Sequence, residues 1–251
     1  MSDILVSSAD GITTLAFNRP DKKNAITAAM YAALADALEA ADKDAAIRAV
    51  LITGTPGCFT AGNDLQDFLA NPPRGNDSPV ARFLRAISTA RKPLVAAVTG
   101  VAVGVGTTML LHCDLVYAAK SARLSLPFVN LALVPEAASS LLLPRTIGNR
   151  RAAELLLMGE PIEAEKAAAW GLINAAVDDD ALAETALKAA RKLAAKAPQA
   201  LALSKQLMKA SPEEIAAQMQ AEMVHFSAQL QSAEAREAMT AFFEKRPPKF
   251  G

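Results

Sequence analysis

In the N-terminal part of the chain, short apolar runs that predict β-strands alternate with amphipathic runs that predict helices. Such an order favours a largely parallel sheet layered with helices, in which ligands bind at the loops that leave the strand ends. The predicted fold class is therefore α/β. The expected strands are residues 4–7 and 13–18, paired around an Ala9-Asp10-Gly11 turn, and residues 49–53, 94–98 and 115–118; the expected helices are residues 27–43, with Thr27 as N-cap, residues 79–90 and a short helix ending near Cys113.

The last third of the chain has a different pattern. From Ala137 onward only residues 173–177 are expected as a strand. Helices are expected at residues 137–147, 180–196, 200–209, 212–229 and 233–245. We therefore predict a core formed by residues 1–195 and a helical C-terminal region formed by residues 196–251.

Composition excludes several classes of function. The 251 residues are 52% hydrophobic and carry no net charge, and basic residues do not interleave with aromatic ones, so a nucleic-acid partner is not expected. The two cysteines, Cys58 and Cys113, are not in a metal-ligand spacing, so neither a metal site nor a disulfide is expected. Residues 1–6 lack the pattern of a secretory signal, and residues 94–111 favour a buried strand and helix over a membrane span, so the expected location is cytoplasmic.

Two glycine-centred segments follow predicted strands and precede predicted helices, at residues 58–65 and 100–108. Glycine permits unusual backbone dihedrals and close approach of a ligand, and the first N–H groups of a helix lack intrahelical partners. If the two segments converge, they direct two backbone donors at one oxyanion, at about 3–4 kcal/mol per donor in acyl-transfer sites. The alternative is tight strand-to-helix packing without a ligand.

The chain resembles the crotonase superfamily of enoyl-CoA hydratases and isomerases over nearly its whole length. The resemblance lies in residues 15–20 with Asn24 and Ala25, and in residues 58–65, 92–100, 113–114 and 241–248. It implies a spiral of ββα units, a C-terminal trimerisation region and an acyl-CoA substrate, with coenzyme A as part of the substrate and no other cofactor. It also implies that the N–H groups of Asn63 and Val105 hold the thioester oxygen, and that the protein is a homotrimer or a dimer of trimers.

The acid and base vary within this superfamily. The two positions at which hydratases carry glutamates hold Thr108 and Phe128 in this chain. Instead, Glu136 is the only carboxylate between Asp114 and Glu154, and burial in its apolar surroundings would raise its pKa. The surrounding segment resembles peroxisomal-type Δ3,Δ2-enoyl-CoA isomerases, in which one glutamate moves the proton, and this implies isomerisation of 3-enoyl-CoA in fatty acid β-oxidation.

Several alternatives stay open. Glu136 could be only a first-turn helix carboxylate, and the protein could be a hydratase, a ring-acyl-CoA isomerase or a non-catalytic acyl-CoA-binding subunit. Asp64 is interpreted as a helix cap, and His112 and His225 as structural residues. The large apolar residues at the chain's end favour an oligomer: Met219, Met223, Phe226, Leu230, Met239, Phe242 and Phe243.

The candidate site follows from these arguments. The catalytic candidates are Glu136, Asn63 and Val105. The resemblance and the neighbouring loops add candidate substrate contacts: Ala61, Gly62, Asn63, Asp64, Leu65, Gly104, Val105, Thr108, Phe128, Lys23, Ala25, Phe242 and Lys245. The basic loop residues Arg19, Lys22 and Lys23 could meet the phosphates of coenzyme A or only solvate the loop, and Lys245 with Phe242 could contact the adenosine or form a frayed basic helix end.

Overall fold

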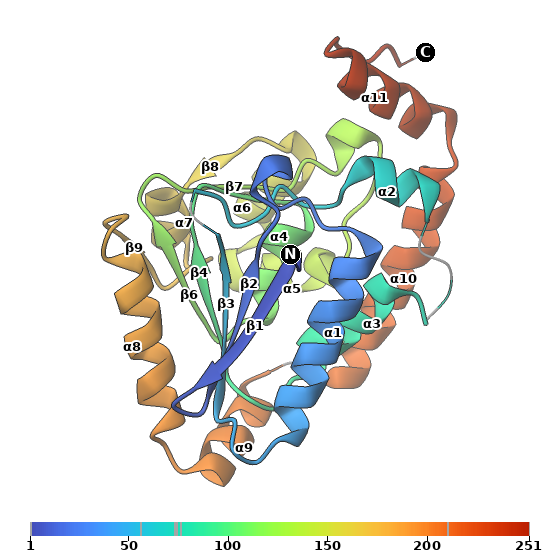
Figure 1. The fold of residues 1–251 in the computed structure, drawn as a ribbon. Coiled ribbons are helices and arrows are strands. Elements are labelled where there is room, and N and C mark those ends of the chain that lie inside the picture. Colours follow the sequence, from blue (N-terminus) through green and yellow to red (C-terminus); the bar gives the residue numbers. More distant parts are fainter. Residues whose placement is uncertain (1, 56, 73–74, 76, 210, 251) are drawn as a thin grey trace.

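The computed structural model describes residues 2–55, 57–72, 75, 77–209 and 211–250. A six-stranded sheet forms the centre of this part of the chain, with strand order β1-β2-β3-β4-β6-β9 (Figure 1). The strands are β1 (Ile4–Ala9), β2 (Ile12–Phe17), β3 (Ala49–Gly54), β4 (Leu94–Val98), β6 (Leu115–Ala119) and β9 (Ala175–Val177). The first two strands are antiparallel and all later neighbours are parallel, so the α/β prediction is confirmed.

Local sequence explains the start of the sheet. The β1–β2 turn consists of Asp10 and Gly11, both at positive φ, as a two-residue hairpin turn requires. All five residues of β4 are buried, which matches a central parallel strand covered on both faces. The predicted strands at residues 49–53, 94–98 and 115–118 are therefore confirmed to within a residue.

Helices cover the sheet on both sides. Helix α1 (Ala28–Lys43) begins where predicted, because the Thr27 side chain accepts a hydrogen bond from the N–H of Met30. It packs against α3 (Pro79–Thr89) and against β1 and β2, whereas α8 (Leu182–Ala194) packs along β3, β4 and β6. Figure 1 shows α1 and α8 on opposite sides of the sheet.

A second, three-stranded sheet was missed from the sequence. It consists of β5 (Val101–Val103), β7 (Arg123–Ser125) and β8 (Ile162–Glu163), in the order β5-β7-β8. Strands of two or three residues are too short to show an alternating pattern, so the expectation of a single strand after Ala137 was wrong. The short elements of the core are the 3-10 helices η1 (Pro20–Lys22), η2 (Met109–His112) and η3 (Val129–Leu131), the helices α2 (Leu65–Ala70), α4 (Val105–Thr108), α6 (Asn149–Ala153) and α7 (Ala164–Trp170), and the π-helix η4 (Glu154–Met158).

The C-terminal part is helical, as predicted, with α5 (Ser139–Ile147), α9 (Pro198–Met208), α10 (Pro212–Leu230) and α11 (Ala233–Glu244). Helix α10 packs on α3 and α5, while α11 extends from the body of the protein (Figure 1). Of the large apolar residues at the chain's end, Phe226 and Met239 are buried within the chain itself. Other apolar side chains stay exposed, namely Phe242 and Phe243 on α11 and Leu203, Leu207 and Met208 on α9.

No helix within the described ranges is both long and apolar enough to cross a lipid bilayer.

Candidate active site

The two glycine-centred segments lie side by side. The Thr60 N–H donates to the Val101 carbonyl at 3.0 Å, and the Val103 N–H donates to the Thr60 carbonyl at 3.1 Å. Gly62 has φ +85°, and a Cβ there would lie 2.6 Å from the Val103 carbonyl oxygen. Only glycine therefore fits where the first segment crosses the second.

Two backbone N–H groups at this junction lack an acceptor. On either side of Asn63, the Gly62 N–H donates to Thr60 Oγ1 and the Asp64 N–H donates to the Ile26 carbonyl. Within the ranges the structure describes, no acceptor is found for the N–H of Asn63 or for that of Val105, the first residue of α4. Unpartnered donors at a helix start suit a developing negative charge.

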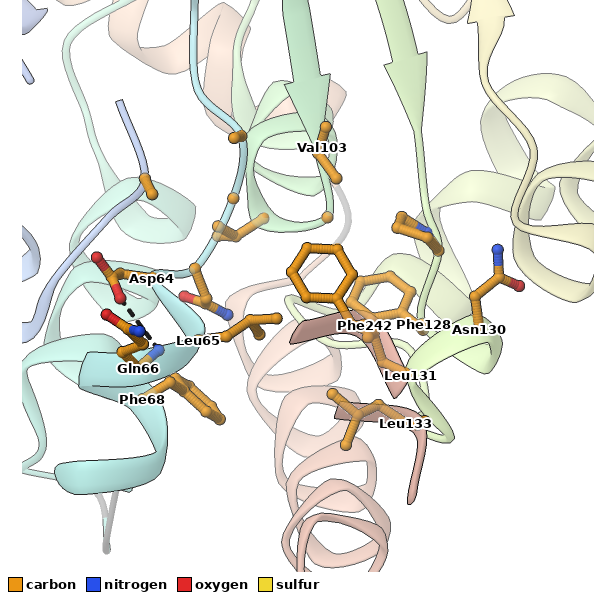
Figure 2. A pocket seen from close by; sticks show the side chains of 18 of the residues that line it. Asp64, Leu65, Gln66, Phe68, Val103, Phe128, Asn130, Leu131, Leu133 and Phe242 are labelled. Carbon is orange, nitrogen blue, oxygen red and sulfur yellow. Dashed lines mark hydrogen bonds between the residues drawn. The ribbon is translucent and has the colours of Figure 1, made fainter. Parts of the chain in front are cut away.

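Both residues line the same cavity, which has a volume of about 610 Å³. Figure 2 shows the side chains of Leu65, Phe128 and Phe242 directed into it. Its wall is largely apolar and includes five phenylalanines: Phe68, Phe128, Phe226, Phe242 and Phe243. Lys22 and Arg246 add positive charge to the lining; Arg246 is ion-paired with Glu237 and Glu244, and the carboxylate of Asp64, which also lines the cavity, is ion-paired with Arg19. Such a cavity suits a ligand with an apolar body and a negatively charged part.

Glu136 lies beside α4. Its side chain is buried, at 8% exposure, and its Oε1 accepts a hydrogen bond of 2.5 Å from Thr108 Oγ1. Thr108 ends the helix that Val105 begins, so the two residues are about 5 Å apart along the helix axis. Burial raises the pKa of Glu136 to about 7; the Thr108 hydrogen bond opposes this shift and the negative charge of Glu222 adds to it. Glu136 is thus poised to gain or lose a proton near neutral pH, although it is not among the residues that line the cavity.

The backbone after Glu136 forms a turn rather than the expected helix start. Ala137 and Ala138 have φ values of 61° and 56°, and α5 begins only at Ser139. The sequence predicted helix from residue 137, because alanine rarely adopts the left-handed conformation. His112 Nε2 lies 2.9 Å from the Ala137 carbonyl, and burial lowers the pKa of His112 to about 4, so the ring is neutral and donates this hydrogen bond.

Tyr31 is a site residue that sequence reasoning missed. Its hydroxyl donates to Asn63 Oδ1 at 2.5 Å, which fixes the side chain of a residue that lines the cavity. Burial and the nearby Glu136 carboxylate both raise the pKa of Tyr31. Tyr31 sits on the buried face of α1 like any core residue, so the sequence carried no signal for this contact.

The structure brings most of the predicted contacts together. Ten of them line the cavity: Ala25, Ala61, Gly62, Asn63, Asp64, Leu65, Gly104, Val105, Phe128 and Phe242. The predictions for Lys23 and Lys245 were wrong in register, since these residues do not line the cavity whereas their neighbours Lys22 and Arg246 do. Lys23 and Lys245 both adopt left-handed backbone conformations, with φ 49° and 55°, which the sequence pattern did not indicate. Thr108 is fully buried and contacts Glu136 instead of the cavity.

Asp64 fits its structural interpretation as a helix cap. The Asp64 side chain accepts hydrogen bonds from the N–H groups of Gln66 and Asp67 at the start of α2, so the predicted cap is confirmed. It also forms a 2.7 Å ion pair with Arg19, so this basic residue is partly engaged within the loop. In the part of the chain that the structure covers, no group of three or more His, Cys, Asp or Glu side chains is arranged to hold a metal ion.

Known proteins are similar to this chain in fold and in sequence. Residues 7–251 match the family model described as enoyl-CoA hydratase/isomerase. The chain is 38% identical over 260 residues to the 1,2-epoxyphenylacetyl-CoA isomerase of Escherichia coli (strain K12), a match that covers 100% of this chain and 98% of the relative. It is 39% identical over 216 residues to human enoyl-CoA delta isomerase 2, covering 82% of this chain and 54% of the relative. The crystal structure of an enoyl-CoA hydratase/isomerase from Pseudoalteromonas atlantica T6c matches with a TM-score of 0.95 at 48% identity, with 100% of both chains covered.

The fold and the cavity define a crotonase-fold enzyme of acyl-CoA chemistry. The chain belongs to the enoyl-CoA hydratase/isomerase family.

Proposed function

We propose that this protein moves the double bond of a 3-enoyl-CoA into conjugation, giving 2-enoyl-CoA, with Glu136 as the only proton carrier. The observation that carries the proposal is the arrangement around α4. The helix ends at Thr108, which binds the Glu136 carboxyl, and begins at Val105, whose N–H is free to bind an oxyanion.

The reaction needs one base and one electrostatic partner. The carbon between the thioester carbonyl and the alkene carries acidic protons; the Glu136 carboxylate removes one, and the electron pair delocalises into a dienolate. The N–H groups of Asn63 and Val105 stabilise the negative charge on the thioester oxygen. Glu136, now protonated, returns the proton to the γ-carbon, and the carbonyl and the conjugated alkene form. Base and acid steps follow one another, so one carboxyl serves both.

The site supports hydration of 2-enoyl-CoA less well than isomerisation of 3-enoyl-CoA. It needs a group that activates water, and the two hydratase carboxylate positions hold Thr108, which is hydrogen bonded to Glu136, and Phe128, which lines the cavity as an apolar wall. A water molecule at these positions would meet a hydroxyl and a phenyl ring instead of a base. Relatives of this chain do include a 2,3-dehydroadipyl-CoA hydratase at 34% identity, so we propose that both reactions be measured.

A ring-containing acyl group is the second candidate substrate. The five phenylalanines of the cavity offer faces and edges against which a flat ring can pack, and Phe68 and Phe226 already meet edge to face at a centroid distance of 6.0 Å. The relative at 38% identity is named as an isomerase of a phenylacetyl-CoA derivative. Isomerisation of a cyclic acyl-CoA would use the same oxyanion donors and the same carboxyl.

The test is an assay of 3-enoyl-CoA and 2-enoyl-CoA with the natural protein and with Glu136→Gln. We expect isomerisation to fall by roughly 10²–10⁴-fold in the variant, because glutamine cannot accept the proton, while acyl-CoA binding persists. Glu160→Gln is the matched control, because it removes an exposed carboxylate without touching the cavity. Unchanged turnover in Glu136→Gln would reject the assignment, hydration faster than isomerisation would favour the hydratase, and binding with neither reaction would favour a non-catalytic acyl-CoA-binding subunit.

A further inference from the structure

A second buried carboxylate lies behind Glu136. Glu222, on α10, is 6% exposed and accepts three hydrogen bonds. The donors are the N–H of Ala138 at 2.7 Å, the N–H of Ser140 at 3.0 Å and the Ser140 hydroxyl at 2.5 Å. All three belong to the turn that follows Glu136 and to the first residues of α5.

The contact exceeds what a helix cap needs. Helix α5 has no side-chain cap of its own, since its N-cap residue is Ala138, and Glu222 supplies the acceptor from 84 residues further along the chain. A local Ser, Thr, Asn or Asp would satisfy the same N–H groups without burying a charge. We therefore look for a role of the buried Glu222 carboxylate beyond capping α5.

The turn itself needs to be held. Two consecutive alanines, Ala137 and Ala138, adopt the left-handed conformation that residues with a Cβ disfavour. His112 binds the Ala137 carbonyl from the side of η2, and Glu222 binds the Ala138 N–H from the side of α10. Gln218, one turn before Glu222 on α10, donates a hydrogen bond to the Ser140 hydroxyl at 2.8 Å and so helps to hold Ser140 against Glu222.

We propose that Glu222 is a positioning residue for Glu136: it holds the strained turn that directs the Glu136 carboxyl at Thr108, and it keeps a second negative charge behind that carboxyl. This inference rests on the proposed function of Glu136 as the proton carrier. The role is distinct from that of Glu136, since Glu222 contacts the backbone N–H groups of Ala138 and Ser140 and acts on Glu136 through this turn.

The electrostatic part of the role follows from the groups around Glu136. Among the groups near Glu136, Thr108 on α4 and Tyr31 on α1 are uncharged. His112 on η2 is neutral, because its pKa is lowered to about 4. Lys205 on α9 and Lys209, the residue that follows α9, act on His112, and Lys209 donates a hydrogen bond to the His112 carbonyl. The negative charge of Glu222 acts on Glu136, and like charge disfavours ionisation of the Glu136 carboxyl. Burial raises the pKa of Glu222 as well, and its hydrogen bonds from Ser140 and Ala138 oppose this shift, so Glu222 acts on Glu136 at those pH values at which Glu222 is ionised.

Two measurements on Glu222→Gln and Glu222→Ala test the proposal. The first is the pH profile of kcat and kcat/KM for 3-enoyl-CoA; the second is a ¹³C NMR titration of the Glu136 carboxyl in protein labelled at glutamate, assigned with Glu136→Gln. In Glu222→Gln the negative charge is gone, so we expect both the acidic limb of the profile and the NMR midpoint to move to lower pH. In Glu222→Ala we expect kcat to fall by roughly 10–100-fold with KM changed by less than about threefold, because misplacement of a base affects the chemical step.

Controls separate the outcomes. Glu213→Gln removes an exposed carboxylate from the first turn of the same helix and should match the natural protein in both readouts. If Glu222→Ala does not fold, Ser140→Ala removes one donor of the same contact and should lower kcat by a smaller factor at unchanged KM. An unshifted NMR midpoint and unchanged kcat in folded Glu222→Gln would overturn the inference. A shifted midpoint in a protein whose natural form does not isomerise 3-enoyl-CoA would support the positioning role and reject only the proposed function.

Discussion

Replacing Glu136 by glutamine removes a buried carboxyl that the folded protein holds at a high pKa, and this changes how stability depends on pH. Glu136 has a pKa of about 7 in the folded state against 4.5 as the ordinary value. A group whose pKa is raised on folding binds the proton more tightly in the folded state. Its contribution to stability is therefore fully present below pH 4.5 and is lost as the pH rises through 7.

The size of the effect follows from the two pKa values. Two and a half pH units at about 1.4 kcal/mol per unit correspond to about 3.5 kcal/mol. Most of this range falls between pH 5 and pH 8.5, so the stability of Glu136→Gln relative to the natural protein should grow by about 2–3 kcal/mol across that interval. Glutamine keeps an acceptor for the Thr108 hydroxyl, so the hydrogen bond does not confound the comparison.

The assay is urea unfolding of both proteins at pH 5 and pH 8.5, at one protein concentration so that association of subunits does not change between samples. His112 also titrates, since its lowered pKa makes the protein less stable as pH falls below 6.5, but this slope is common to both proteins and cancels in the difference. A difference that stays constant within about 0.5 kcal/mol would show that Glu136 is not held at a raised pKa, and the argument for a buried base would fail. A difference that grows on acidification would contradict its sign.

Three further predictions address other parts of the site. Thr108→Val removes the hydrogen bond that lowers the Glu136 pKa, so the acidic limb of kcat/KM for isomerisation should move to higher pH; an unmoved limb would exclude this contact as a regulator of the base. In urea unfolding, Gly62→Ala should destabilise the protein by roughly 1–3 kcal/mol more than Gly148→Ala. The two positions have nearly the same φ, 85° and 84°, but only the new Cβ at Gly62 meets the Val103 carbonyl. Equal losses of stability in the two variants would refute the crowding argument. Sedimentation should give a trimer or hexamer, because the apolar face of α9 is exposed in the single chain, and a concentration-independent monomer would refute this.

The sequence predicted those parts of the fold that long periodic patterns encode. Helix α1 was placed from its cap at Thr27 to Lys43, and the buried strands were found, because burial on both faces requires an unbroken apolar run. The second sheet was missed, since β5, β7 and β8 are too short for a pattern and form only when distant segments pair. Local sequence decides the first kind of element and tertiary pairing decides the second.

Some residues of the candidate site could likewise be predicted from the sequence, and others could not. Glycines and a lone carboxylate in an apolar stretch are visible in the sequence, and they indicated Gly62 and Glu136. The contacts that support the site are not visible, because Tyr31, which binds Asn63, and Glu222, which binds the turn after Glu136, come from helices far away in the chain and look there like ordinary core or surface residues. The left-handed turn after Glu136 is likewise imposed by tertiary contacts, against the helical preference of alanine.

In the proposed isomerisation, one buried carboxyl, that of Glu136, both removes and returns the proton. The most direct test of this role is isomerisation in ordinary water of 3-enoyl-CoA carrying deuterium at the carbon next to the thioester, with the product analysed by NMR for deuterium at the γ-carbon. Because Glu136 is 8% exposed, we expect part of the label to reach the γ-carbon before it exchanges with water, and we expect Glu136→Gln to form product roughly 10²–10⁴-fold more slowly under the same conditions. Product formed without any label at the γ-carbon, or formed by Glu136→Gln at the rate of the natural protein, would contradict the role of Glu136 as the proton carrier.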